Sequence, residues 1–330
     1  MKVCIFDHHL AERFTVCNGS SGISDILFCG LIERGFDVTY LLGSTNQIPS
    51  KYVNKVINLS PGELDAIRYG HRPICDYFNG DLFHSHTSGK HASFNFNGFD
   101  GRWLATCHGS DLEDAAADSV IFVGKDQMKR HFDLFDTHLR SKRVFQIYNC
   151  FQDGIEYRSG PHDQLVHLSV IRPDKGVHLL PYIAKSVGRV IHIYGHIGSL
   201  DYYNQFLKPH EGKFIEYLGP INSVEEKNTM FSQAELFIHP AIFHEPFGIT
   251  LVESLKSGVP ITGFRRGCLL EHQKNLAEYI QIFDSVTDLC ANIGNRSYKC
   301  DPGKLIDYAN RFCPSNMIDE YVRVYQHISA

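Results

Sequence analysis

The sequence predicts an α/β protein with two Rossmann-like domains. Short β-rich runs alternate with helical stretches, which is typical of parallel sheets flanked by helices. The chain has 330 residues, more than one hydrophobic core normally supports, so two domains are expected. The alternation is interrupted once, by the polar segment 152–163 with Gly154, Gly160 and Pro161, which is the best linker candidate.

The first half, residues 1–151, begins with an expected strand at Lys2–Asp7 and a polar loop that extends through Asn18 to Gly22. Ile23–Arg34 then has apolar residues at helical spacing, and Gly35 ends that helix. Further strands are expected at Val38–Leu42, Asp81–Ser85, Trp103–Thr106, Ser119–Val123 and Val144–Tyr148.

The second half, residues 164–300, repeats this alternation. Strands are expected at 164–169, 190–194, 214–218, 236–239 and 260–263, and helices at 176–187, 224–233 and 248–257. Residues 301–330 read as helix with a break at Pro314, a segment that can pack back on the first half. Parallel sheets bind ligands at the carboxyl ends of their strands, so two such halves predict a cleft between them.

Composition is that of an ordinary soluble globular protein, with 43% hydrophobic and 21% charged residues. No apolar run approaches the roughly 18 residues of a membrane helix, and the first nine residues read as a strand rather than a signal peptide. The ten cysteines are scattered without a CxxC pair, which favours reduced thiols and a cytoplasmic location. The net charge of −5 gives no general indication of nucleic-acid or membrane binding.

One segment is locally basic. Its cationic residues are Lys125, Lys129, Arg130, His131, His138, Arg140, Lys142 and Arg143. Such a run can dock on anionic lipid or on a DNA backbone. Asp126, Asp133 and Asp136 lie within it, so a solvated helix face followed by a loop is an equally good interpretation.

The most informative stretch is Phe243–Glu253. Pro246 and Gly248 indicate a helix start, whose first-turn N–H groups beside Gly248, Ile249 and Thr250 form an anion site. Glu245 precedes the helix and Glu253 lies about a turn and a half inside it. An anion site with flanking carboxylates suggests a sugar joined to a diphosphate. The alternative is a capped surface helix.

These residues resemble the nucleotide-binding domain of family 4 glycosyltransferases, which are retaining enzymes with two Rossmann-like domains (the GT-B architecture). Glu245 and Glu253 match the Glu-x7-Glu signature of the family. The segments Ser257–Pro260 and Gly267–Glu271 match its downstream Gly-x-Pro and Gly-Gly-x-x-Glu patterns, with Cys268 in place of one glycine. Leu218-Gly219-Pro220 matches a strand that ends in glycine near the nucleobase.

The resemblance implies roles for the residues of the second half. Glu245 would hold hydroxyls of the transferred sugar, and Glu253 those of the ribose. Lys175 would hold the diphosphate, and Val170 occupies the position of a family arginine, so Arg172 is a candidate to replace it. The implied donor site contains Arg172, Lys175, Gly219, Pro220, Phe247, Gly248, Ile249, Thr250 and Glu253.

The same resemblance extends to the first half. Gly19, Ser21 and Gly22 would form a glycine-rich loop at the donor, and His108, before Gly109, would contact the transferred sugar. Asn149 matches an asparagine at the interdomain turn. No metal or other cofactor is expected. His84 and His86 could be taken for metal ligands, but we find no third ligand at suitable spacing.

The resemblance implies a metal-independent retaining glycosyltransferase with His108, Lys175 and Glu245 as catalytic residues. A UDP-sugar is the donor we expect, and GDP and ADP stay open as alternatives. The acceptor is open: a natural product, a protein, or a hydroxymethylated base in DNA, in which case the enzyme would modify DNA. A non-catalytic nucleotide-sugar-binding protein of the same fold is the alternative outside enzymes. An epimerase or phosphorylase of this architecture is the alternative within enzymes.

Overall fold

The structure, a computed structural model, divides into two compact units. Unit 1 comprises Met1–Cys150 and Pro314–Ala330, and unit 2 comprises Phe151–Cys313. The structure describes residues 1–14, 19–86, 93–109, 117–139 and 142–329, with side chains 135–139 excepted. The segment expected as a linker therefore falls within unit 2, and the last helix falls within unit 1.

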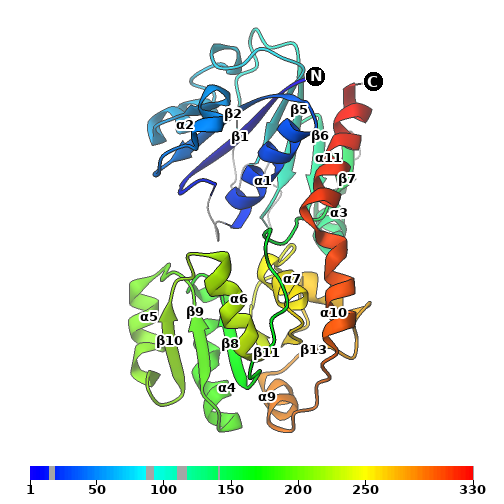
Figure 1. The fold of residues 1–330 in the computed structure, drawn as a ribbon. Coiled ribbons are helices and arrows are strands. Elements are labelled where there is room, and N and C mark those ends of the chain that lie inside the picture. Colours follow the sequence, from blue (N-terminus) through cyan, green and yellow to red (C-terminus); the bar gives the residue numbers. More distant parts are fainter. Residues whose placement is uncertain (15–18, 87–92, 110–116, 140–141, 330) are drawn as a thin grey trace. The chain divides into compact units, whose positions relative to one another are not determined.

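Unit 1 is built on a seven-stranded sheet in the order β3-β2-β1-β4-β5-β6-β7, with every neighbouring pair parallel. Figure 1 labels β1, β2, β5, β6 and β7 of this sheet. Its strands are β1 (Lys2–Ala11), β2 (Asp37–Ser44), β3 (Val56–Asn58), β4 (Leu82–Ser85), β5 (Arg102–Cys107), β6 (Ser119–Phe122) and β7 (Arg143–Gln146). The chain order reverses direction between β1 and β4, and ligands of such sheets usually bind at the carboxyl ends of the strands at this point.

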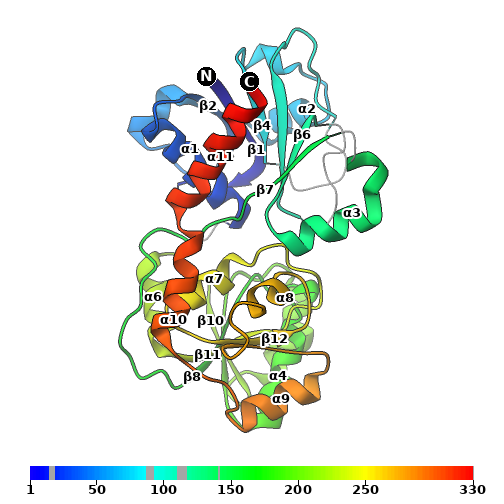
Figure 2. The same ribbon diagram turned by 90° about the vertical axis from the view of Figure 1, so that its right-hand side faces the viewer.

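The helices of unit 1 are α1 (Gly19–Glu33), α2 (Pro61–Arg68), α3 (Lys125–Leu139) and α11 (Pro314–Ser329). Helix α11 packs against α1, as Figure 2 shows. Gly30 permits this approach, because a Cβ there would lie 2.2 Å from Cδ1 of Ile318. Arg34 and Asp319 add an ion pair of 2.6 Å. These contacts hold the final helix in unit 1.

Unit 2 is built on a six-stranded parallel sheet in the order β10-β9-β8-β11-β12-β13. Its strands are β8 (Gln164–Leu168), β9 (Ile191–Tyr194), β10 (Ile215–Gly219), β11 (Ala234–His239), β12 (Ile261–Phe264) and β13 (Ile280–Phe283). Here the chain order reverses between β8 and β11.

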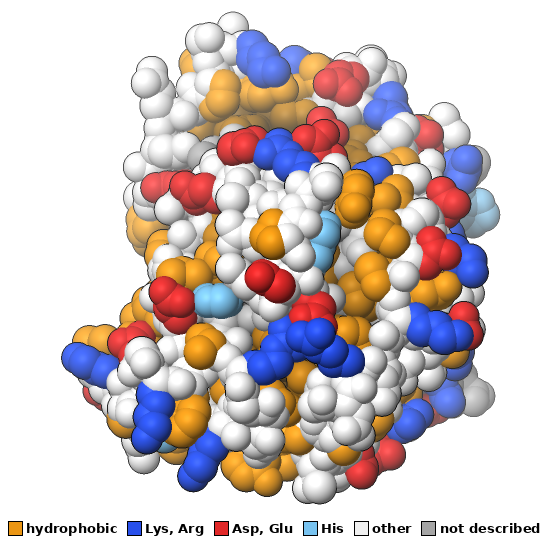
Figure 3. Space-filling model, turned by 60° about the horizontal axis from the view of Figure 1, so that its bottom comes forward, with side chains coloured by type: hydrophobic (Ala, Val, Ile, Leu, Met, Phe, Trp, Pro, Cys, Tyr) orange, Lys and Arg blue, Asp and Glu red, His pale blue; other side chains and the backbone are white. Residues whose placement is uncertain are grey.

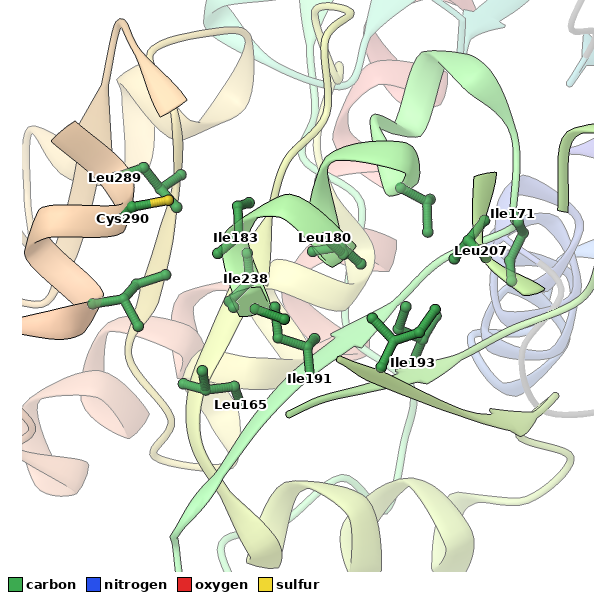
Figure 4. Close-up of a cluster of buried hydrophobic side chains, with 14 of the residues drawn as sticks. Leu165, Ile171, Leu180, Ile183, Ile191, Ile193, Leu207, Ile238, Leu289 and Cys290 are labelled. Atoms are coloured by element: carbon green, nitrogen blue, oxygen red, sulfur yellow. The ribbon is translucent and has the colours of Figure 1, made fainter. Parts of the chain in front are cut away.

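The helices of unit 2 are α4 (Leu180–Val187), α5 (Leu200–Phe206), α6 (Val224–Gln233), α7 (Ile249–Lys256), α8 (Cys268–Gln273), α9 (Val286–Gly294) and α10 (Pro302–Ala309). Figure 4 shows the core under α4, where Leu180 and Ile183 meet Ile191 and Ile238 of the sheet. All four side chains are fully buried. Burying each stabilises the unit by about 1.5–3 kcal/mol, which fixes the sheet whose strand ends carry the site.

The two-domain α/β class predicted from the sequence is confirmed, but several element boundaries were wrong. Strand β1 extends to Ala11, and Gly19 to Gly22 form the first turn of α1 instead of a loop. Asn18 lies outside the described residues. Six strands and α-helices among the described residues were missed: β3, α2, α5, α8, β13 and α9.

The described surface carries charges of both signs. Figure 3 shows acidic, basic and hydrophobic side chains interspersed over one face of the molecule. The basic segment forms α3 and the start of β7, and within it His131 is buried while Lys142 donates to the carbonyl of Ala117. His138 and Arg140 lie outside the described side chains. None of the described helices combines the length and the hydropathy that crossing a membrane requires.

Candidate functional site

The carboxyl ends of β8 and β11 bring together the loops that carry the predicted charged residues. Gly176 has a left-handed backbone (φ 67°), and a Cβ there would lie 1.9 Å from the carbonyl oxygen of Pro240. The main-chain N–H of Ile242 donates to the carbonyl of Asp174 at 3.0 Å. The turn after β8 therefore lies directly against the segment after β11.

Lys175 and Glu245, which were predicted separately, form an ion pair across this junction. Lys175 Nζ lies 2.5 Å from Glu245 Oε2, and the two side chains are 16% and 18% exposed. The ammonium also lies 4.5 Å from the ring centroid of Phe243. A cation and a carboxylate thus stand side by side at the solvent-facing switch point of the sheet, the usual ligand position in such folds.

The backbone of Glu245 is held by the Gly267-Cys268 step. The Cys268 N–H donates to the Glu245 carbonyl at 2.9 Å. A Cβ on Gly267 would lie 2.5 Å from that same oxygen, so only glycine allows the approach. Cys268 is buried beside Gly248, where it takes the place of the glycine expected from the resemblance.

Helix α7 begins one residue after the predicted position. Its N-cap is Gly248 (φ 73°), which has no side chain to accept from the first-turn amides near Ile249 and Thr250. Those two residues are half-buried. The positive end of the helix dipole therefore lies next to Glu245 and Lys175, where an anion would be stabilised.

Phe247 does not lie on the open side of this site. Its side chain is 2% exposed and packs edge-on against Phe312 at 5.5 Å between ring centroids. Its carbonyl lies 3.3 Å from Nε2 of His272. The Phe247 side chain therefore supports the turn from the core, and its expected donor contact stays a prediction.

Glu253 is fully buried, which sequence reasoning did not anticipate. Lys227 of α6 places its Nζ 2.9 Å from both carboxylate oxygens. The ribose contact of Glu253 stays a prediction, and Lys227 is a residue that sequence reasoning missed. A lone lysine in a helix usually reads as a solvated side chain, so only the structure identifies its partner.

Arg172 forms an ion pair with Asp174. Its guanidinium makes two hydrogen bonds to Asp174, at 2.9 and 2.7 Å, and its side chain is 49% exposed. Val170, in the position of the family arginine, is also exposed. The geometry therefore favours a surface ion pair for Arg172 over the expected phosphate contact.

Gly219 and Pro220 lie at the carboxyl end of β10, two strands from β8. Gly219 has φ 84°, and its carbonyl accepts the N–H of Gly195 at 2.9 Å. Pro220 is exposed and Gly219 half-buried. The end of β10 is thus available on the same edge of the sheet as Lys175, which is where the predicted nucleobase contact requires it.

In unit 1, the predicted site residues lie at two places, the first turn of α1 and the end of β5. Gly19, Ser21 and Gly22 lie in the first turn of α1, where Ser21 and Gly22 are buried, so they do not form the expected glycine-rich loop. His108 Nε2 lies 2.9 Å from His86 Nδ1 at the ends of β4 and β5. Burial lowers the pKa of His108 to about 4, so its ring is neutral at pH 7.

The histidines predicted to be unlikely metal ligands have other partners. His84 is fully buried, with Nδ1 2.6 Å from the Tyr325 hydroxyl and Nε2 2.7 Å from the Thr106 hydroxyl. Burial holds its pKa well below the usual value. Asn149, at the end of unit 1, is 5% exposed, and its Oδ1 is buried without a hydrogen-bond partner among the described residues.

Sequence reasoning also missed a buried charge network at the end of β1. Asp7 accepts from Arg13 at 2.9 Å and from His9 Nδ1 at 2.8 Å. Burial alone would raise the pKa of Asp7, but these contacts hold it well below its usual range. Asp7, His8 and His9 offer atoms within 4.8 Å of one another, a spacing that a metal ion could use. The Arg13 guanidinium pairs with Asp7 and also with Asp25, at 2.9 and 2.7 Å.

Comparison with protein families gives one match relevant to this site. Residues 158–288 match the family described as "Glycosyl transferases group 1". This range contains Lys175, Lys227, Glu245 and Glu253. A comparison with curated protein sequences gives no match.

Solved structures with the same fold include three that span nearly the whole chain. Sucrose-phosphate synthase from Thermosynechococcus elongatus is 13% identical with a TM-score of 0.74, and 99% of this chain and 98% of that one are covered. HepE of Anabaena in complex with UDP-glucose is 15% identical with a TM-score of 0.69, at 99% and 100% coverage. A glycosyltransferase from Rickettsia africae is 16% identical with a TM-score of 0.68, at 99% and 98% coverage. At these identities the likeness establishes the GT-B fold.

Proposed function

We propose that this chain, whose residues 158–288 match the glycosyl transferases group 1, is a metal-independent, retaining transferase with a UDP-sugar as donor. The observation that carries this proposal is the Lys175–Glu245 pair beside the start of α7. It joins a cation, a carboxylate and a helix N-terminus at one sheet edge.

Each of these groups has a task in the proposed transfer. When the bond from the sugar to the diphosphate breaks, negative charge collects on the diphosphate. Lys175 and the first-turn amides of α7 would stabilise that charge, the part that a metal ion plays in other enzymes. Glu245, beside Lys175, would hold hydroxyls of the transferred sugar, and His108 is proposed as a further sugar contact from unit 1.

The UDP-sugar assignment is supported by HepE, whose structure contains UDP-glucose and has the same fold. The exposed end of β10 at Gly219 and Pro220 is the proposed nucleobase contact. The acceptor is proposed only as a hydroxyl compound. No described feature favours DNA, because the basic segment of α3 includes the buried His131 and the acidic residues Asp126 and Asp133.

Two measurements test the proposal. Ligands that bind only the folded state raise the melting temperature, so UDP and UDP-glucose should raise it more than GDP, ADP and their sugars do. UDP release from UDP-glucose in the presence of candidate acceptors should persist in excess EDTA, and NMR of the product should show the donor's anomeric configuration. Equal shifts with all nucleotides contradict the UDP assignment. Activity lost in EDTA and restored by Mn²⁺ contradicts the metal-independent mechanism.

A further inference from the structure

Lys227 of α6 and Glu253 of α7 form an ion pair inside unit 2, closed to solvent. Lys227 Nζ lies 2.9 Å from both Oε1 and Oε2 of Glu253, and the two side chains are 4% and 1% exposed. The main-chain N–H of Gln152 also approaches Oε1, at the longer distance of 3.4 Å. The Glu253 carboxylate therefore makes two short contacts with the Lys227 ammonium and one longer contact with the Gln152 amide.

Such a pair constrains the chemistry of Glu253. Taking a carboxylate out of water is costly, and a buried charge that loses its partner is strongly destabilising. An ionised Glu253 at this depth therefore requires Lys227. The two-point contact also fixes the orientation of the carboxylate, since both oxygens are bound to one nitrogen.

The pair also lies between the elements that flank the proposed nucleotide. Helix α6 begins at Val224, four residues after the exposed Pro220, and α7 begins at the proposed phosphate contact. We propose that Lys227 is a positioning residue for donor binding, which holds Glu253 so that the carboxylate accepts from the ribose hydroxyls. This inference rests on the proposed function.

The contacts indicate how the ribose would reach Glu253. A carboxylate has about four lone-pair sites, and Lys227 uses one on each oxygen. The amide of Gln152 makes the longest of the three contacts, so it is the one that a hydroxyl would replace. Asn228, next to Lys227, binds the segment that follows Gln152. Its side-chain amide donates to the Gly154 carbonyl at 3.0 Å and accepts from the Glu156 N–H at 3.2 Å. Binding would shift this segment at Gln152 and leave the ion pair in place.

The test uses a readout that a purely structural pair would not affect, the preference for ribose. Affinities of UDP and 2′,3′-dideoxy-UDP are measured by calorimetry for the wild type, Lys227→Met, Glu253→Gln and the double variant. The wild type should prefer UDP at least about tenfold, the scale of a hydrogen bond to a charged group. In each single variant, the affinities for UDP and 2′,3′-dideoxy-UDP should differ by no more than about twofold. The double variant should show no smaller difference, because both substitutions act on the same ribose contact.

Two further variants complete the design. Lys256→Met removes a lysine of α7 that pairs with Asn310 at 2.7 Å, and it should keep the wild-type ratio. Lys227→Gln replaces Lys227→Met if the latter fails to fold, and it should also lose the preference, because a neutral amide does not supply the positive charge that compensates the buried carboxylate. A wild-type ratio retained in the Lys227 variants, or a wild type without ribose preference, overturns the inference. A wild type that binds neither nucleotide contradicts the proposed function itself.

Discussion

At the scale of single residues, the structure separates Lys175 from Arg172. A cation that touches a leaving diphosphate acts more on the transition state than on the ground state. Hydrogen bonds to charged groups contribute about 1.5–3 kcal/mol, so Lys175→Ala should lower kcat/KM at least about tenfold. Arg172 is half exposed and bound to Asp174, so Arg172→Ala should change kcat/KM by less than about twofold. Steady-state kinetics of both variants measure the difference.

The double variant provides the control. If Arg172 is a surface residue, Lys175→Ala/Arg172→Ala should behave like Lys175→Ala alone. A tenfold loss in Arg172→Ala, combined with non-additivity in the double variant, would mean that Arg172 leaves Asp174 and joins the phosphate site.

The same residues show how far the sequence predicts the site. Lys175 and Glu245 were each identified from a local motif, but their contact depends on β8 and β11 being neighbours in the sheet. Lys227 gave no signal, because its partner Glu253 lies 26 positions away and the pairing follows from how α6 and α7 pack. Local patterns predict residue types at a site, and the tertiary packing decides which of them touch.

At the scale of elements, the turn after β8 depends on Gly176. Gly176 and Gly188 both have left-handed backbones, at φ 67° and 66°. Alanine in that conformation costs about 1–2 kcal/mol. At Gly188 nothing lies within 4 Å of an added Cβ, whereas at Gly176 the Cβ would meet the Pro240 carbonyl at 1.9 Å. Gly176→Ala should therefore destabilise the protein more than Gly188→Ala does, and it alone should reduce activity, because it displaces Lys175.

Urea unfolding and kcat/KM, measured on both variants, check this expectation. Gly188→Ala is the matched control for the backbone cost. Equal stability losses in the two variants, with activity retained, would mean that the Pro240 contact relaxes without moving Lys175.

Helices differ in how far their starts can be predicted from the neighbouring residues of the sequence. Helix α2 could have been predicted, because Ser60 and Glu63 form a capping box around Pro61. The start of α1 could not, because Gly19 and Ser20 favour a loop by composition. Arg13 contacts Ser24 and Asp25 of that helix, at 3.3 and 2.7 Å, and such contacts are not visible in the sequence.

At the scale of the whole molecule, the alternation of strands and helices was enough to predict two parallel α/β units. It could not give the strand order, because the neighbours β1 and β4 are separated by β2, β3 and α2. The return of α11 to unit 1 depends on the fit of Ile318 against Gly30. The sequence alone suggested this return only as a possibility for the terminal segment.

Buried neutral histidines give both units a common dependence on pH. Burial lowers the pKa of His84 and His86 in unit 1 and of His239 in unit 2 well below the ordinary value, and that of His167 to about 4. As the pH falls, the histidines of the unfolded chain bind protons near pH 6.5, whereas these buried histidines of the folded chain bind them only at lower pH. Stability should therefore fall as pH falls from about 6.5 towards 4.

The size of this effect can be tested at His167. Its Nδ1 lies 2.8 Å from the Ile238 carbonyl and its Nε2 2.7 Å from the Ser169 hydroxyl, so the neutral ring has both partners. With a pKa of about 4 in the folded state, His167 alone should cost about 2 kcal/mol of unfolding free energy between pH 7 and pH 5. Urea unfolding at both pH values should show a smaller loss in His167→Gln than in the wild type. His71→Gln, at an exposed position, is the control. An equal loss in His167→Gln and the wild type would mean that His167 is not a source of the acid sensitivity.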